Sequence, residues 1–222
     1  MRHIRELTKS LSIGILGIIT LLGFVATMII AAHYLFVNGA YFDFFGDRDP
    51  SGAFRSTALL HIVPAMTALM IGALQMLSAL RGQFARFHKA AGWCYVLSVI
   101  LSGVGAILLA PNTLGGAMNG VGFTILALCW IISTLIAVYH ATNRQQTAHR
   151  AWMIRSFALT FAGVTLRLQL GFFQALGLTF SEAYSITAWS SWIPNLLIAD
   201  IWLRRGAVRP GSALKVEKSA GA

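Results

Sequence analysis

Charged side chains are scarce in this chain of 222 residues: Asp, Glu, Lys and Arg make up 11% of it, whereas apolar residues make up 57%. Acidic residues are the rarer sign, with 7 Asp and Glu against 17 Lys and Arg. A soluble domain carries a much more polar surface, so this composition excludes one. Because the apolar residues gather in runs near twenty residues long, the sequence predicts an all-α polytopic membrane protein.

Cysteine pairs and the signatures of soluble enzymes are also absent. Cys94 and Cys129 stand alone, without a CxxC pair, and provide neither a disulfide framework nor a metal motif. The sequence contains no GxGxxG, Walker, GxSxG or HExxH motif. The net charge of +10 resides in short segments beside apolar runs, so we expect these cations to orient the chain in a membrane and not to bind nucleic acid.

Six apolar runs predict a single bundle of six transmembrane helices. We assign residues 1–205 to this domain and expect 206–222 to form a disordered basic cytoplasmic tail. The predicted helices span residues of about 11–36, 56–79, 90–110, 119–141, 151–173 and 185–203.

Lys and Arg alternate between the two ends of these runs. They gather in the N-terminal segment, the second and fourth loops and the tail, while the third loop carries no charge and the fifth only Glu182. By the positive-inside rule, both termini are cytoplasmic. We therefore expect a multi-pass protein of a bacterial inner membrane whose main partner is the lipid bilayer.

The histidines fall into two layers. His61 lies near the outer end of the second predicted helix, close to His33, whereas His88, His140 and His149 cluster at the cytoplasmic boundary. Histidines on facing helices can hold a b-type haem, so His88 and His149 are candidate axial ligands of the haem iron, with His61 in a second polar layer. The alternative is that these histidines are interfacial or capping residues and that the small residues beside them serve helix packing.

Two arginines lie inside the fifth apolar run, where an unpaired charge costs several kcal/mol. Arg155 lies about one turn from the cytoplasmic end, at the depth of Asp200, so we expect a structural ion pair. Arg167 lies roughly 24 Å along the same axis and reaches the layer of His61. It could hold a haem propionate, a quinone oxygen or an anionic substrate, or it could pair with Glu182.

One face of the fifth helix is polar or small along its length. His149, Ser156, Thr160, Gly163 and Arg167 share this face, which must look toward other helices. In the sixth helix, Pro194 frees a carbonyl that a neighbour must satisfy, and Asn195 is expected to act as interhelical glue.

Four segments of the chain resemble a known family. They are HIVPAMTALMIGALQ, RGQFARFHKAAGWCYV, AHRAWMIRSFALTFAGVTLRL and SEAYSITAWSSWIPN. Together they look like a family of predicted prokaryotic membrane proteins, domain of unknown function 2306, over about residues 56–200. The resemblance implies a membrane fold and assigns no activity. The matching residues are His61, Gly72, Arg81, His88, Gly92, Tyr95, His149, Arg150, Arg155, Arg167, Glu182, Tyr184 and Asn195.

A looser architectural similarity links the bundle to cytochrome b561 and ferric-reductase proteins, whose helices hold haem b. This similarity implies an oxidoreductase that transfers electrons with a quinone or another redox partner. The residues also permit a small transporter or a proton or anion permeation protein, in which the histidines and Arg167 line a polar path. A third interpretation is a membrane scaffold without catalysis.

Overall fold

The computed structural model is helical throughout the part of the chain that it describes. This part comprises Leu21, Phe24, Val25, Met28, Ile29 and residues 53–76 and 85–207. It contains no β-strand. The helices are α3 (Ala53–Met76), α5 (Ala85–Leu109), the short 3-10 helix η2 (Ala110–Asn112), α6 (Ala117–Thr142), α7 (Gln146–Thr160), α8 (Ala162–Ala175), α9 (Phe180–Ser190) and α10 (Ile193–Ala207).

Among the described residues, four helical segments are long and apolar enough to cross a membrane. These segments are Ala53–Met76, Arg86–Asn112, Ala117–Thr142 and Gln146–Ala175. A helix satisfies its own backbone hydrogen bonds, which lipid cannot do, so long apolar runs fold in this way. Their outward faces carry exposed Leu, Ile, Val and Phe side chains, as a lipid-facing surface requires.

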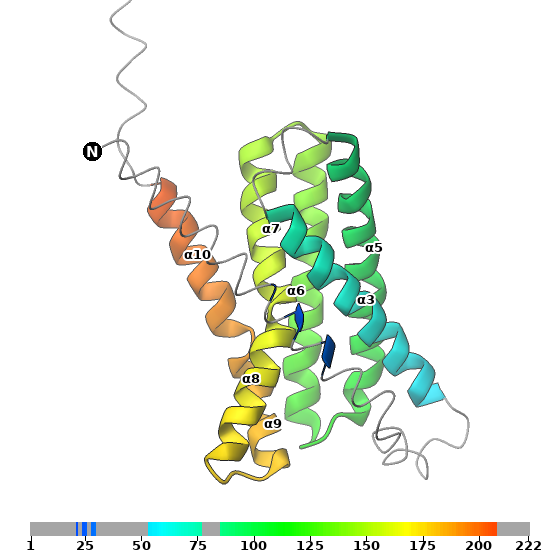
Figure 1. Ribbon diagram of the computed structural model, residues 1–222, viewed down its shortest axis with the longest axis vertical. Helices are drawn as coiled ribbons and strands as arrows, with labels where there is room; N and C mark the ends of the chain where they lie inside the picture. Colours follow the sequence, from blue (N-terminus) through cyan, green and yellow to red (C-terminus); the bar gives the residue numbers. More distant parts are fainter. Residues whose placement is uncertain (1–20, 22–23, 26–27, 30–52, 77–84, 208–222) are drawn as a thin grey trace, which may run out of the picture.

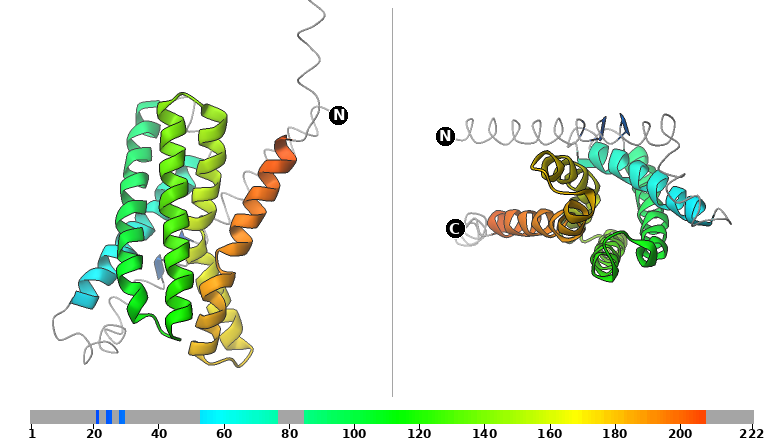
Figure 2. Two further views of the ribbon diagram at one scale, coloured as in Figure 1. Left: turned by 180° about the vertical axis from the view of Figure 1, so that it is seen from behind. Right: turned by 90° about the horizontal axis from the view of Figure 1, so that it is seen from below.

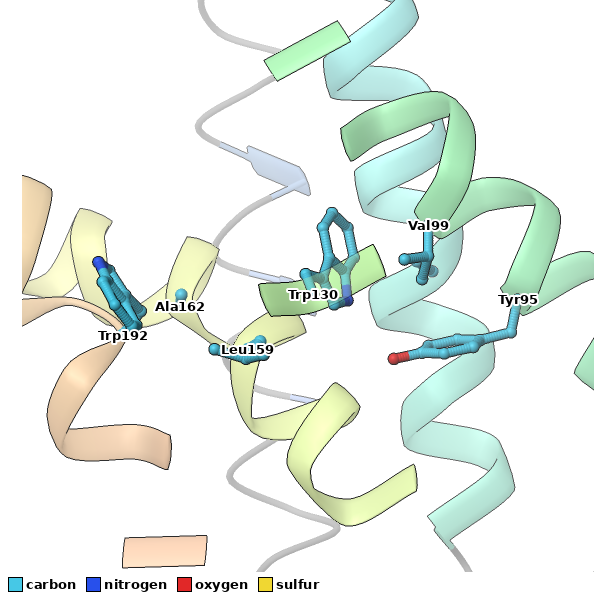
Figure 3. Packing of buried hydrophobic residues seen from close by; sticks show 7 residues of the cluster. Tyr95, Val99, Trp130, Leu159, Ala162 and Trp192 are labelled. Carbon is cyan, nitrogen blue, oxygen red and sulfur yellow. The ribbon is translucent and has the colours of Figure 1, made fainter. Parts of the chain in front are cut away.

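Helices α3, α5, α6 and α7 form a ring in which each helix packs against two others. α3 contacts α5 and α7, and α6 contacts the same two helices from the other side. The end-on view in Figure 2 shows these helices around one centre. The core of the ring is a cluster of apolar residues drawn from all of them and from the helices that follow. Its buried members are Ala68, Tyr95, Val99, Trp130, Leu159, Ala162 and Trp192 (Figure 3).

The last three helices are attached to one side of this ring. α8 and α9 pack against each other at one end of the molecule, and α9 also contacts α6. α10 packs on α7 and then diverges from the ring, so its C-terminal end stands apart from α5 and α6 (Figures 1 and 2).

The fifth and sixth predicted helices are each interrupted. The fifth, expected over 151–173, extends over 146–175 and breaks at Phe161 into α7 and α8. The sixth, expected as one helix over 185–203, is two helices that meet at Ser191 and Trp192. This second break precedes Pro194, because a proline ring clashes with the carbonyl one turn earlier. The 180–207 segment is therefore not one of the four candidate spans.

Some expectations fall outside the described residues. Most of the first predicted span, 11–36, is among them, together with His33, Arg81 and the tail from 208 onward. Five residues of that first span are described; they are helical, and Phe24 packs against the core residues Leu69, Phe157 and Val164.

Candidate functional site

Four hydroxyl groups form a continuous hydrogen-bonded chain across the centre of the ring. It runs from Thr134 on α6 through Ser156 on α7 and Tyr95 on α5 to Thr160 on α7. The oxygen–oxygen distances along it are 2.7, 2.8 and 2.7 Å. All four side chains are buried. Figure 3 shows Tyr95 reaching from α5 into the core near Trp130. We call these four residues the hydroxyl chain; it joins three helices at mid-depth.

Backbone carbonyls anchor both ends of the hydroxyl chain. Thr134 Oγ1 donates to the carbonyl of Trp130 at 2.8 Å, and Thr160 Oγ1 donates to the carbonyl of Ser156 at 3.0 Å. The indole Nε1 of Trp130 donates to Thr160 Oγ1 at 2.9 Å. In each of the three links between hydroxyls either oxygen can be the donor. The four hydroxyls carry one proton each, so they cannot donate in all three links and to both carbonyls at the same time. The order of donors along the chain reverses when Thr134 and Thr160 exchange which of them donates to its backbone carbonyl and which donates into the chain.

Gly72 allows α3 to approach this centre. A Cβ atom at Gly72 would lie 2.6 Å from Phe157 Cδ2 and 3.0 Å from Tyr95 Cε2. Both distances are shorter than van der Waals contact. Glycine at this position therefore lets α3 pack directly against both the Phe157 and the Tyr95 ring.

The inner histidines are held at different helix contacts. His149 Nδ1 lies 2.8 Å from the carbonyl oxygen of Ala137 on α6, and because a carbonyl only accepts, His149 donates this bond. His88 lies in the first turn of α5, where its carbonyl accepts a 2.8 Å hydrogen bond from Gln75 Nε2 of α3. The structure thus places His88 at the α3–α5 contact and His149 at the α6–α7 contact.

A small cavity lies next to His88. The cavity next to His88 has a volume of about 40 Å³, well below the roughly 300–1,000 Å³ of small-molecule and cofactor pockets. Within the described ranges, no three or more His, Cys, Asp or Glu side chains gather around one point that could hold a metal ion. A haem held by His88 and His149 would have only two protein ligands, so haem ligation by this pair stays a prediction.

The outer layer is built on a close contact between α3 and α5. His61 Nδ1 lies 2.9 Å from the carbonyl oxygen of Ser102 and 3.0 Å from its Oγ, and Ser102 Oγ donates to the carbonyl of His61 at 2.9 Å. A Cβ atom at Gly105 would lie 2.8 Å from the His61 backbone nitrogen. The histidine ring is therefore fixed by a helix contact as tight as that at Gly72.

Arg167 lies in the same outer layer. Its Nη1 donates to the carbonyl of Gly163 at 2.7 Å. The alternative partner Glu182 is engaged elsewhere: its Oε2 accepts from the backbone nitrogen of Thr179 at 2.8 Å and from Thr179 Oγ1 at 2.7 Å. These bonds form a capping box at the start of α9 and lower the pKa of Glu182. No salt bridge joins Glu182 to Arg167 in the described residues.

Arg155 and Asp200, expected as a pair from their matching depths, are in contact. Arg155 Nη2 lies 2.6 Å from Asp200 Oδ1, and Arg204 Nε lies 2.6 Å from the other carboxylate oxygen. The Arg155 guanidinium also stacks 4.9 Å from the ring centre of Trp152. The pair fastens α10 to α7 near the end of the ring where α7 begins.

Two residues that the sequence analysis did not single out, Gln169 and Ser190, satisfy the break in the sixth helix. Because Pro194 has no N–H, the Ser190 carbonyl lacks its helical donor. Gln169 Nε2 of α8 donates to that carbonyl at 3.2 Å, and Ser190 Oγ donates in return to Gln169 Oε1 at 2.9 Å. The carbonyl that proline frees is thus satisfied by a neighbouring helix.

Asn195 connects the two breaks. Its Nδ2 donates to Thr165 Oγ1 at 2.9 Å and to the carbonyl of Ala158 at 3.4 Å. Ala158 precedes the Phe161 break and Thr165 follows it, so one side chain of α10 holds both parts of the interrupted fifth helix. The role of interhelical glue expected for Asn195 matches these contacts.

Sequence reasoning identified part of the hydroxyl chain. It grouped Ser156 and Thr160 on one polar face, but it did not identify Tyr95, Thr134 and Trp130 as their partners. One signal was present: Tyr95 follows His88 by seven residues and precedes Ser102 by seven, so all three share a face of α5.

One comparison with known proteins identifies a family for this chain, and it adds no activity. The family model described as "Predicted membrane protein (DUF2306)" matches residues 58–203, which include the hydroxyl chain and His61, His88 and His149. This match confirms the resemblance drawn from the sequence. No curated protein and no solved structure matches the chain. Since the matched segment covers more than half of the sequence, the chain belongs to this family of predicted membrane proteins, DUF2306.

Proposed function

We propose that the protein conducts protons through the interior of its helical bundle in a bacterial inner membrane. The end of the bundle where α6 ends and α7 begins would face the cytoplasm. One observation carries this proposal: a chain of four buried hydroxyls with reversible donor order lies at the centre of the ring of helices. A buried polar network is costly in a membrane unless fully satisfied, and those that occur inside bundles often mark proton or ion pathways.

The hydrogen-bond pattern favours a proton over an anion. An anion needs donors that are free to point at it, whereas every hydroxyl in the chain has an acceptor oxygen within the network. A proton needs groups that both accept and donate, which is what hydroxyls supply. The network therefore suits proton transfer better than anion binding.

The two histidine layers stand at either end of the proposed route. Ser156 lies seven residues from His149 along α7, and Tyr95 lies seven residues from Ser102, the partner of His61, along α5. Each interval is about 10 Å along a helix. We propose that water crosses these two intervals and that the histidines take up and release the proton.

Proton flux in vesicles tests the proposal. The purified full chain is reconstituted with a pH-sensitive dye inside, and a potassium gradient with valinomycin drives protons inward. We expect the interior of the vesicles to acidify faster than that of empty vesicles. The Tyr95→Phe variant should lose most of this proton flux, because the phenol oxygen links Ser156 to Thr160.

Tyr139→Phe is the matched control, since Tyr139 is exposed on α6. It should conduct like the wild type. The thermal unfolding midpoint of each variant shows whether it is folded. Wild-type flux no greater than that of empty vesicles, or full flux in a folded Tyr95→Phe variant, would exclude the proton route. Wild-type flux at the level of empty vesicles would favour the interpretation of the protein as a membrane scaffold without catalysis.

Haem ligation is the second candidate, and a single contact favours it. His149 donates from Nδ1 to a backbone carbonyl, an arrangement that orients metal-bound histidines through their other nitrogen. A reduced-minus-oxidised visible spectrum of protein produced with ample haem tests this candidate. A sharp band that His149→Ala abolishes would support it, and a colourless, folded wild type would remove it.

A further inference from the structure

The charges of the described chain are concentrated at one end of the bundle. We call this the basic end; there α3, α6 and α10 terminate and α5 and α7 begin. The single acidic residue of the described chain at this end is Asp200, and both of its carboxylate oxygens are bound by arginines. The basic residues of this end are Arg86, Lys89, Arg144, Arg150, Arg155, Arg204 and Arg205.

On α5, the side chains along one exposed face follow the order of regions in a lipid leaflet, from acyl tails to headgroups. Leu108, Leu101 and Leu97 are exposed. Trp93, 54% exposed, comes next, and the exposed cations Lys89 and Arg86 complete this stripe at the basic end. Spacings of three, four and seven residues keep these side chains on one face. Apolar side chains suit acyl tails, tryptophan suits the interface, and cations suit headgroups.

α10 repeats this order. Ile198 is exposed, Trp202 is 58% exposed, and Arg205 follows three residues later on the same face. Trp93 and Trp202 are thus exposed tryptophans next to exposed cations on two separate helices. Neither stripe takes part in the hydroxyl chain.

We propose that the basic end binds the headgroups of anionic phospholipids from the surrounding bilayer through the two stripes on α5 and α10. Arg and Lys donate to phosphate oxygens, and no described carboxylate at this end remains to compete with them. This binding is independent of proton conduction. Each cation near an anionic surface changes the local preference for anionic lipid by about fivefold.

Tryptophan quenching tests the proposal on the full chain. The protein is reconstituted in phosphatidylcholine vesicles that contain equal mole fractions of either brominated phosphatidylglycerol or brominated phosphatidylcholine. We expect stronger quenching by the anionic lipid, because Trp93 and Trp202 lie beside the bound headgroups. The triple variant Arg86→Gln/Lys89→Gln/Arg205→Gln should lose this excess.

Arg55→Gln at the opposite end of the bundle is the control and should keep the excess; unfolding midpoints verify that each variant is folded. Equal quenching of the wild type by both lipids, or an excess that survives in the triple variant, would overturn the proposal. A third arm adds inorganic phosphate to vesicles with the anionic lipid. If millimolar phosphate removed the excess, the stripes would bind free phosphate and the assignment to lipid would be wrong.

Discussion

Gly72 controls how closely α3 approaches the hydroxyl chain. We predict that Gly72→Ala destabilises the protein by about 1–3 kcal/mol, because the new methyl group would lie 2.6 Å from Phe157 and force the rings to move. Gly171→Ala on α8 is the control, since a Cβ atom there meets no atom within 4 Å. Its effect should be neutral, or stabilising by up to about 1 kcal/mol through helix propensity. Unfolding midpoints in detergent measure both, and equal shifts would contradict the close contact.

Glu182 makes the stability of α9 depend on pH. The folded-state pKa of this carboxyl is lowered by its hydrogen bonds to Thr179. The bonds therefore stabilise the fold fully above the unfolded pKa of about 4.3, and this contribution is lost as the pH falls through the lower folded pKa.

We predict that wild type and Glu182→Gln differ in unfolding midpoint at pH 7 and converge in strong acid. Glu182 is exposed, so the difference at neutral pH is small, and the trend with pH is the informative quantity. Thermal melts over a pH series measure it. A difference that does not change with pH would show that the carboxylate charge is not involved.

At the scale of the helix, the two interruptions depend on side chains that restore the lost hydrogen bonds. We predict that Asn195→Ala destabilises the protein by about 1 kcal/mol, because interhelical hydrogen bonds in membranes average roughly 0.6 kcal/mol each and Asn195 Nδ2 donates two. Asn143→Ala, which removes a bond to the Tyr139 carbonyl within α6, is the control. Asn143→Ala should destabilise the protein less than Asn195→Ala. A lower unfolding midpoint for Asn143→Ala than for Asn195→Ala would contradict the role of Asn195.

The positions of these two helix breaks depend on contacts between helices, which the sequence alone does not reveal. The apolar runs predicted α3, α5 and α6 to within a few residues, since lipid imposes their length. The break at Phe161 has no proline beside it, and the contact next to it comes from α10, where Asn195 donates to the Ala158 carbonyl. The effect of Pro194 was foreseen, but the identity of its donor, Gln169, depends on tertiary packing.

The candidate site likewise contains contacts that the sequence predicted and contacts that it did not. Arg155 and Asp200 were expected to meet because depth in a membrane can be counted along each helix. Tyr95 meets Ser156 and Thr160 across 61 and 65 residues of chain, and only the order of helices around the ring brings them together. The depth of a residue in the membrane can thus be predicted from the sequence. Which residues of equal depth contact each other can be known only from the arrangement of the helices.

For the whole molecule, we predict that residues 143 and 181 face opposite sides of the membrane, because the 146–175 segment separates them. In a chain without native cysteines, an impermeant maleimide applied to intact cells should label Ser181→Cys and leave Asn143→Cys unlabelled. Labelling after membrane disruption is the control. Labelling of both sites in intact cells would show that 146–175 does not cross, and the opposite pattern would reverse the orientation.

The contact made by Phe24 bears on the size of the folding unit. The family match begins at residue 58, yet Phe24 covers core side chains of α3, α7 and α8. A chain shortened to the matched segment would present Leu69, Phe157 and Val164 without this cover, close to the rings that enclose Tyr95. The segment matched by the family model therefore leaves out Phe24, a side chain that packs on the core cluster containing Phe157.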